Sequence, residues 1–189
     1  SFCTHIGADL LLKGVGKIEI GIAYGGNLFA VVAAESVNLD LRMDNSHFIR
    51  EMGMQVKNAV NEQYDIRHPK LTGVAGVNIV TFYESSDNLK ATYKNVHVFS
   101  TGQIDRSPGG TGTSAMLAYM VRKGENDGNQ PVTVEGFAGG LFEGRIVDTW
   151  QENEITMHRP EISGRAFITG LNQFILNSDD PMSEGIPGD

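Results

Sequence analysis

A loop rich in glycine and hydroxyl side chains carries the residues best suited to chemistry. The eleven residues 105–115 read DRSPGGTGTSA and precede the apolar run MLAYMV. If this loop opens a helix, the amides of Gly110 and Thr111 lie at the helix N-terminus, where unpaired N–H groups and the helix dipole favour an anion. Asp105, just upstream, is suited to hold a substrate ammonium group. An anion site beside a carboxylate indicates an amino-acid ligand.

A plainer interpretation of the loop stays open at this point. The letters SPGG are typical of a turn, and Thr113 or Ser114 can serve only to cap the helix. Two phosphate-binding loops are excluded by spacing. A P-loop needs Lys followed by Ser or Thr after its last glycine, whereas Gly112 is followed by Thr and Ser. GGTG also differs from GxGxxG with an acidic residue about 20 positions later.

Composition limits the other function classes. The 189 residues are 40% hydrophobic and 20% charged, with a net charge of −8, which is typical of a globular protein whose partner is a small molecule or another protein. No run of Lys or Arg indicates a nucleic-acid surface, and no apolar run is long enough for a membrane span. The five histidines lack the HxH and HExxH spacings of metal sites. We therefore expect no nucleic acid, membrane or metal, and the single cysteine, Cys3, favours a reducing cytoplasm.

The apolar spacing predicts the elements that must position the loop. Asn45 caps an expected helix with apolar residues at helical spacing from Phe48 to Val60, and a second, buried helix follows the loop and ends at Gly124. Short alternating runs elsewhere predict about eight or nine strands with hairpin turns. We expect His97, which alternates with valines in one such run, to be a solvated or hydrogen-bonded strand residue. The expected fold class is α/β (α+β).

Once these segments are placed, they carry a family resemblance. DRSPGGTGTSA resembles the DRSPCGTGTSA motif of the proline racemase family, which includes hydroxyproline 2-epimerases and trans-3-hydroxyproline dehydratases, and ten of its eleven residues agree. Segments resembling family segments follow in order along nearly the whole chain. They are GKIEIGIAYGGNLFAVV, FIREMGMQVKNAV, the HP of residues 68–69, VEGFAGGLFEGR, EISGRAFITG and DDP.

The resemblance implies a fold, a domain division and partners. The implied fold is a strand-rich barrel around a central helix, as in proline racemase and diaminopimelate epimerase, with the active site between two such halves. This chain resembles only the second half. We expect residues 1–135 to form that half and residues 136–189 to be strands that return to pack on a missing N-terminal half of the same protein. A homodimer remains open, and no cofactor is implied.

The resemblance also implies site residues, and one of them departs from the family pattern. It makes Gly110 and Thr111 donors to the carboxylate of an imino or amino acid and Asp105 the partner of its nitrogen. Two-base racemisation needs two opposed thiols. Gly109 stands where the family has its second catalytic Cys. Cys3, in CTHIG, resembles the motif of the family's first catalytic Cys only superficially. A two-cysteine mechanism therefore does not transfer to this sequence.

Three interpretations of Gly109 stay open. A single base from the other half would suit a dehydratase, because loss of a β-hydroxyl needs no acid on the opposite face of the α-carbon. A water molecule in the space beside Gly109 could instead donate a proton weakly. Finally, the protein could be an inactive amino-acid-binding paralogue or an engineered fragment. We expect an enzyme that acts at the α-carbon of proline or hydroxyproline, as a racemase, epimerase or dehydratase, with the binding protein as the alternative.

Overall fold

Eight strands form a closed barrel. The computed structural model describes residues 1–128, 130–183 and 185. In these residues the strands follow one another around the barrel in the order of the sequence. They are β1 (Phe2–Leu12), β2 (Gly16–Tyr24), β3 (Leu28–Ala33), β4 (Ile79–Ser85), β5 (Tyr93–Phe99), β6 (Val132–Glu135), β7 (Leu141–Glu152) and β8 (Ile155–Gly164). Antiparallel pairing of β8 with β1, at Met157 and Phe2, closes the barrel.

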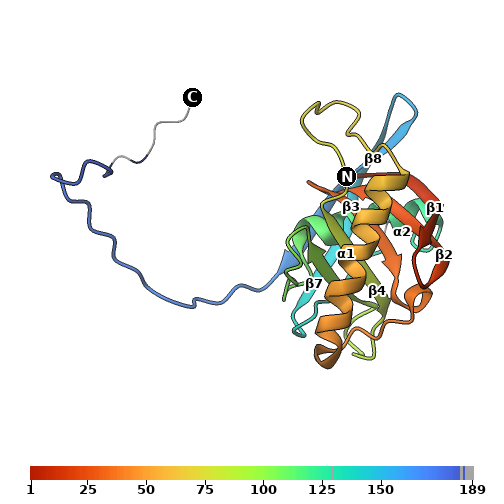
Figure 1. Cartoon of the computed structure of the whole chain (residues 1–189), viewed down its shortest axis with the longest axis horizontal. Helices are drawn as coiled ribbons and strands as arrows, with labels where there is room; N and C mark the ends of the chain where they lie inside the picture. Colours follow the sequence, from red (N-terminus) through yellow and green to blue (C-terminus); the bar gives the residue numbers. More distant parts are fainter. Residues whose placement is uncertain (129, 184, 186–189) are drawn as a thin grey trace.

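Two crossovers carry the two α-helices. Pairs β3–β4 and β5–β6 are parallel, whereas the other neighbouring strands are antiparallel. Parallel neighbours need a long connection, which is usually helical. Helix α1 (Ser46–Gln63) lies in the first crossover and helix α2 (Gly110–Lys123) in the second. Both helices and the barrel around a central helix are therefore confirmed, and the strand number lies within the expected range (Figure 1).

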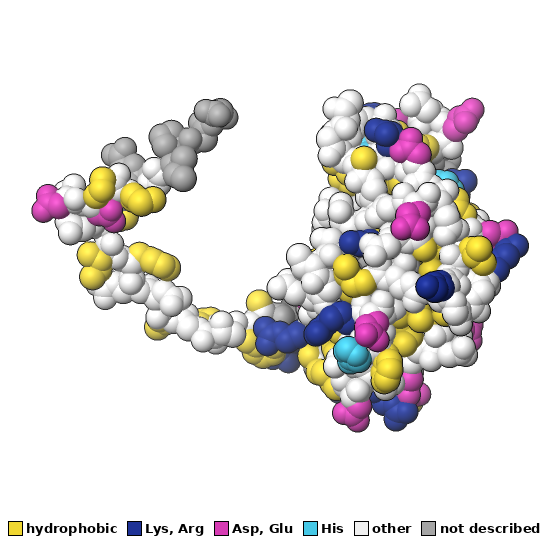
Figure 2. All heavy atoms as spheres, in the orientation of Figure 1, with side chains coloured by type: hydrophobic (Ala, Val, Ile, Leu, Met, Phe, Trp, Pro, Cys, Tyr) yellow, Lys and Arg dark blue, Asp and Glu magenta, His cyan; other side chains and the backbone are white. Residues whose placement is uncertain are grey.

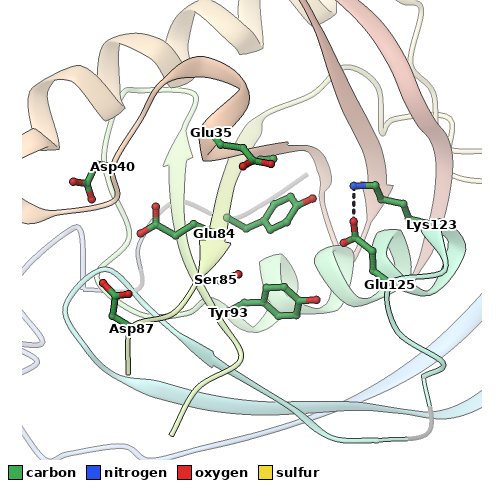
Figure 3. Close-up of a pocket in the computed structure, with 10 residues that line it drawn as sticks. Glu35, Asp40, Glu84, Ser85, Asp87, Tyr93, Lys123 and Glu125 are labelled. Atoms are coloured by element: carbon green, nitrogen blue, oxygen red, sulfur yellow. Dashed lines mark ion pairs between the residues drawn. The ribbon is translucent and has the colours of Figure 1, made fainter. Parts of the chain in front are cut away.

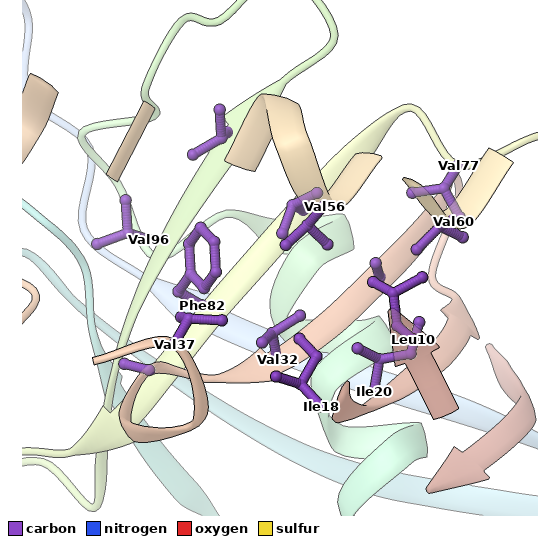
Figure 4. Close-up of a cluster of buried hydrophobic side chains, with 14 of the residues drawn as sticks. Leu10, Ile18, Ile20, Val32, Val37, Val56, Val60, Val77, Phe82 and Val96 are labelled. Atoms are coloured by element: carbon purple, nitrogen blue, oxygen red, sulfur yellow. The ribbon is translucent and has the colours of Figure 1, made fainter. Parts of the chain in front are cut away.

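Strand β3 buries side chains on both of its faces. In β3 the side chains of Leu28, Ala30 and Val32 belong to one apolar cluster, and those of Phe29 and Val31 to a second. The first cluster packs under α1, where Figure 4 shows Val56 and Val60 above the side chains of the strands. The second surrounds α2. Strands buried on both faces are typical of parallel pairing, which explains why β3 is apolar along its whole length.

Helix α2 is buried on nearly its whole circumference. Every residue from Gly112 to Met120 is buried, and the helix contacts β1, β2, β3, β7 and β8. It ends where Gly124 adopts a left-handed conformation, with φ 80°, whose amide closes the last turn. The barrel therefore fixes the direction of α2 and the place where its N-terminus emerges.

A segment beyond the barrel leaves apolar side chains exposed. After Gly164 no described residue belongs to a helix or strand, and Leu171 and Phe174 are 95% and 89% exposed. Figures 1 and 2 show this segment extending from the barrel with hydrophobic side chains along it. Strands β7 and β8 lie beyond the boundary expected at residue 135, yet they pair within the same barrel. The packing expected for residues 136–189 on another half of the protein stays a prediction.

No helix of the described residues combines the length and apolar character that crossing a membrane requires.

A contact between α1 and β5 generates the first prediction. A Cβ atom at Gly53 would lie 2.6 Å from Cβ of Val98 and 2.7 Å from its Cγ2. Gly53→Ala gains about 1 kcal/mol of helix propensity, but overpacking in a core costs about 1–3 kcal/mol. We expect the clash to outweigh the gain and the free energy of unfolding, measured by urea denaturation, to fall.

The matched control lies on the exposed side of the same helix. Asn58→Ala adds helix propensity without a buried contact, so we expect the free energy of unfolding to rise by about 0.5 kcal/mol. An increase of the same size for Gly53→Ala would show that α1 does not approach β5 as closely as described.

Candidate anion-binding site

The loop of residues 105–109 leads from β5 into the buried helix through two local turns. The Asp105 amide donates to the carbonyl of His97, at 3.0 Å. Asp105 Oδ1 accepts from the Ser107 amide at 2.9 Å and from Ser107 Oγ at 3.0 Å, which is an Asx turn. Gly109 is the residue before the helix, with φ 68° and ψ 124°. The loop is therefore a built turn, as in the plainer interpretation, and it also opens a helix.

Three buried donors converge on one carbonyl oxygen of this loop. Pro108 O accepts from Asn95 Nδ2 at 2.9 Å, from His97 Nε2 at 2.6 Å and from Thr113 Oγ1 at 2.9 Å. Asn95 makes this bond although its Oδ1 is buried and accepts no bond among the described residues. An unpartnered buried acceptor costs about 1–3 kcal/mol. The Pro108 carbonyl is thus held inside the barrel, and the peptide before Gly109 has one orientation.

The hydrogen bonds of His97 define its tautomer. A carbonyl oxygen only accepts, so Nε2 carries the proton that is donated to Pro108. Nδ1 of the neutral ring then accepts from Thr81 Oγ1 at 2.9 Å. Burial lowers the pKa of His97, while the bond to Pro108 and the charge of Asp105 act in the opposite direction. His97 is only 2% exposed, so the ring is a neutral, buried clamp.

The ring of His97 occupies the space into which two glycines would project a side chain. A Cβ built on Gly109 would lie 2.6 Å from His97 Nε2, and one on Gly112 would lie 2.5 Å from the same atom. Real Cβ atoms do not approach other atoms so closely. Gly109 also has a positive φ, which L side chains rarely adopt. Glycine at both positions therefore allows the imidazole to lie against the first turn of α2.

A hairpin approaches the same turn from another side. Gly25 and Gly26 connect β2 to β3, and a Cβ on Gly25 would lie 2.6 Å from the amide nitrogen of Ala115 and would clash with the carbonyl oxygen of Thr111. The backbone of this hairpin turn therefore lies against the first turn of α2.

The outer side of the helix N-terminus is open. Gly110 and Thr111 are exposed, whereas Gly112 and Thr113 are buried. The first amides of an α-helix have no partner within the helix, and the dipole adds a partial positive charge there. These two amides are consequently free to donate to a carboxylate or a similar anion at a place that the barrel fixes.

Two hollows border the loop. One, of about 610 Å³, is lined by Asp105 and Arg106 together with Arg50, Phe99 and Phe137 among others. The other, of about 550 Å³, is lined by Ser107 and Pro108, by Phe142 of β7, and by Arg165 and Phe167 of the segment after β8, among others. Of the predicted site residues, Asp105 lines the first hollow, whereas Gly109 and the first helix residues, Gly110 and Thr111, line neither.

A separate acidic pocket lies at the other end of α2. It measures about 590 Å³ and is lined by several carboxylates, including those of Glu35, Glu84 and Glu125. Figure 3 shows them facing the pocket, with Lys123 paired to Glu125 at 2.6 Å. Burial raises the pKa of Glu84. A helix of 14 residues separates this pocket from the loop by about 20 Å, so it is not part of the same site.

Cys3 has the surroundings of an unreactive thiol. It is 1% exposed, and its Sγ donates to the carbonyl of His5 at 3.1 Å. Burial raises its pKa to about 11, which disfavours the thiolate needed of a base or nucleophile. Among the described residues, no group of three or more His, Cys, Asp or Glu side chains is placed to hold a metal ion.

Some of the side chains that hold the loop through hydrogen bonds were not predicted from the sequence. Asn95 and Thr81 were not singled out, and His97 was expected to be a strand residue that is solvated or hydrogen-bonded. It is hydrogen-bonded and buried. The signal was the alternation of polar and apolar letters in NVHVF, residues 95–99, which also fits a strand with one face in water. Only the position of α2 shows that the polar face of β5 is buried too.

A closed barrel around a buried helix, with glycine-rich backbone at the helix N-terminus, defines the class of fold. The chain matches the family model described as "Proline racemase" over residues 1–187, and it belongs to that family. It is 37% identical over 185 residues to a proline racemase of Clostridioides difficile and 35% identical over 175 residues to a 4-hydroxyproline 2-epimerase of Cereibacter sphaeroides.

Solved structures show the same fold. A hydroxyproline epimerase from Agrobacterium vitis, solved with bound trans-4-hydroxy-L-proline, superposes with a TM-score of 0.84 at 26% identity. A probable proline racemase from Agrobacterium radiobacter, with bound carbonate, gives 0.85, also at 26%. Each comparison covers 98% of this chain but 53–54% of the solved one. The curated relatives above are matched over 98% and 92% of this chain and 55% and 52% of their own length. The chain thus spans about half the length of the relatives it matches.

The buried imidazole predicts a pH dependence of stability. The folded-state pKa of His97 lies below its ordinary value of 6.5, so the unfolded chain binds more protons below that pH. Stability from the neutral ring is complete above about pH 6.5 and is lost as the pH falls through the folded-state pKa. In His97→Gln this loss is removed. We expect the variant to lose less free energy of unfolding than the wild type between pH 7.5 and pH 5, measured by urea denaturation.

His47→Gln is the matched control, because the His47 side chain is 70% exposed. We expect His47→Gln and the wild type to lose the same free energy of unfolding between the two pH values. An identical pH profile for His97→Gln and the wild type would mean that His97 is not held neutral.

Proposed function

We propose that the complete protein containing these residues acts at the α-carbon of proline or hydroxyproline and binds the substrate carboxylate at the N-terminus of α2. The observation that carries this proposal is the pair of exposed amides, at Gly110 and Thr111, on a helix start that buried hydrogen bonds hold in place. Family membership supports it, and one structural relative contains trans-4-hydroxy-L-proline.

The binding residues divide the charges of the substrate between them. In this proposal the amides of Gly110 and Thr111 donate to the carboxylate, and the Asp105 carboxylate pairs with the substrate nitrogen. Asp105 Oδ1 is already held by Ser107. The turn therefore fixes the direction of the Asp105 side chain.

The chemistry proposed for this site uses a base on one face of the substrate only. A base from another part of the protein removes the α-proton, and Gly109 offers no group that could return a proton on the opposite face. With a 3-hydroxy substrate, the electron pair left at the α-carbon forms a double bond to the β-carbon, and the β-hydroxyl takes up a proton and leaves as water. The enamine product then tautomerises to a pyrroline. Epimerisation would need a water beside Gly109 as the second acid.

A second candidate function is binding without turnover. The observation that favours it is the surroundings of Gly109, because the nearest titratable ring, His97, is buried and has both nitrogens hydrogen-bonded. Such a protein would retain affinity for the amino acid and lack a proton donor on this face.

The segment after Gly164 supports a proposal about partners. We propose that its exposed apolar side chains, including Phe167, Leu171 and Phe174, pack on a preceding half of the same protein, with a second copy of the chain as the alternative. A contiguous exposed apolar surface of this kind is typical of a contact region. The substrate would then lie between the loop and that partner half.

Solvent exchange separates catalysis from binding. We expect the full-length protein, incubated in D₂O with L-proline, trans-4-hydroxy-L-proline or trans-3-hydroxy-L-proline, to incorporate deuterium at the α-carbon or to release a pyrroline with one of them. Proton NMR measures both. Calorimetric binding of one of these compounds without exchange or product would favour the binding protein, and absence of binding as well would contradict the proposed site.

Asp105→Asn tests the nitrogen partner. The amide oxygen can still accept from Ser107, so the turn is retained, but the charge that pairs with the substrate nitrogen is lost. We expect the affinity measured by calorimetry to fall at least tenfold, equivalent to about 1.4 kcal/mol. Asp9→Asn, at an exposed carboxylate paired with Lys17, is the control and should bind as the wild type does. Unchanged affinity in Asp105→Asn would show that Asp105 does not hold the nitrogen.

Hydrogen exchange tests the packing of the segment after Gly164. In the full-length protein we expect amides of residues 166–176 to exchange at least about tenfold more slowly than in an unstructured peptide of the same sequence, because packing restricts local opening. Exchange at the peptide's rate would contradict packing on either partner.

A further inference from the structure

The imidazole of His97 lies where a side chain at position 109 would have to go. The φ of 68° at Gly109 directs a built Cβ to within 2.6 Å of His97 Nε2 and 2.7 Å of Cδ2, and so toward the barrel interior. Three residues further along the chain, a Cβ on Gly112 would lie 2.5 Å from the same Nε2 atom and 2.8 Å from Nδ1. One ring therefore fills the space beside both glycines.

The ring has no freedom to move out of this space. Thr81 holds Nδ1 and Pro108 holds Nε2, so both nitrogens are bonded on opposite sides of the ring. Phe29 packs against it edge to face, with the ring centroids 6.0 Å apart. A buried polar group that leaves such bonds without replacement loses about 1–3 kcal/mol for each. The ring is fixed, so the glycines must accommodate it.

We propose that His97 is a positioning residue that determines the reaction open to this site. Its ring and a side chain at position 109 are mutually exclusive, and its bond to Pro108 fixes the loop in a conformation with a positive φ at position 109, which favours glycine. The site then presents the Gly110 and Thr111 amides and no acid or base on this face. The part of this inference that concerns reaction class rests on the proposed function, whereas the exclusion itself does not.

The ring of His97 also limits what a thiol at position 109 could do. Gly109→Cys alone does not rebuild a family-type site, because the new Cβ and the His97 ring would occupy the same space. A thiol at this position needs a smaller residue at position 97, which frees the space and releases the Pro108 carbonyl from one of its three donors. Position 97 is therefore a second determinant of whether this face can return a proton.

Unfolding cycles test the exclusion without substrate. Gly112 is not in a left-handed conformation, so Gly112→Ala probes the contact with the ring alone. In the full-length protein we expect Gly112→Ala to lower the thermal midpoint by about 3–10 °C, because the added methyl group overpacks the contact between the helix and the His97 ring. In a His97→Val background, the same substitution should lower the midpoint by less than half as much.

Gly110→Ala is the matched control, since a Cβ there would have no described heavy atom within 4 Å. We expect Gly110→Ala to change the thermal midpoint by the same small amount in both backgrounds. An equal loss for Gly112→Ala in the two backgrounds would overturn the proposal, as would a Gly109→Cys variant that is as stable as the wild type.

A spectroscopic signature separates positioning from simple packing. With ¹⁵N-labelled histidine, the wild type should show His97 as the neutral tautomer protonated at Nε2, and Gly109→Cys should lose that signal. His97→Gln retains an N–H donor for Pro108, whereas His97→Val does not. We therefore expect the amide signals of Gly110 and Thr111 to keep their positions in His97→Gln and to shift in His97→Val. Equal shifts in the two variants would show that the hydrogen bond does not position the loop.

Turnover assays address the reaction class separately. If the full-length wild type exchanges the α-proton, we expect racemisation to appear in His97→Val/Gly109→Cys and to be at least tenfold slower in Gly109→Cys. Racemisation by Gly109→Cys at the rate of the double variant would overturn the proposal. Because the unfolding cycles involve no substrate, an absence of activity in all these proteins would contradict the proposed function and leave the exclusion supported.

Discussion

The burial of α2 inside the barrel is the constraint on which the rest of the structure depends. The surrounding chain must pack closely against a helix that is enclosed on nearly every side. At the first turn of α2, hairpin backbone and an imidazole ring make these close contacts. Gly25 of the β2–β3 hairpin meets the helix from one side, and His97 of β5 meets it from another. Glycine at positions 25, 109 and 112 makes both approaches compatible with a closed barrel.

The same enclosure turns a helix end into a defined site. Unpaired amides occur at the start of every α-helix, so their presence alone carries little information. Here the peptide that precedes them is fixed by three buried donors to the Pro108 carbonyl, and the preceding turn is fixed by Asp105 and Ser107. Donors that are already oriented lose little entropy when an anion binds, which is the general advantage of a preorganised site. The rigidity of the loop thus follows from the packing of the core.

The sequence predicts a part of the structure well where a pattern is compatible with only one structure. The helical spacing from Phe48 to Val60 and the glycine at position 124 are patterns of this kind, and both helices were predicted from them. The alternation in β5 is compatible with two structures, because a polar strand face can lie in water or can bond to buried backbone. His97 belongs to the second case, and only the course of α2 through the barrel decides it. The continuation of the barrel beyond residue 135 was not apparent from the sequence for a similar reason, since the pairing of β7 with β6 and of β8 with β1 depends on closure of the whole barrel.

The structure also changes the meaning of the glycine at position 109. Taken from the sequence, Gly109 is a deletion, a place where a sulfur is expected and an empty space remains. In the structure the space that a Cβ would enter is filled by His97, which comes from a strand twelve residues earlier in the chain. The loop and the ring that fills this space come from different elements, α2 with its preceding loop and β5. In our proposal, similarity in the loop therefore bears on the ligand, whereas the pair of positions 97 and 109 bears on the reaction.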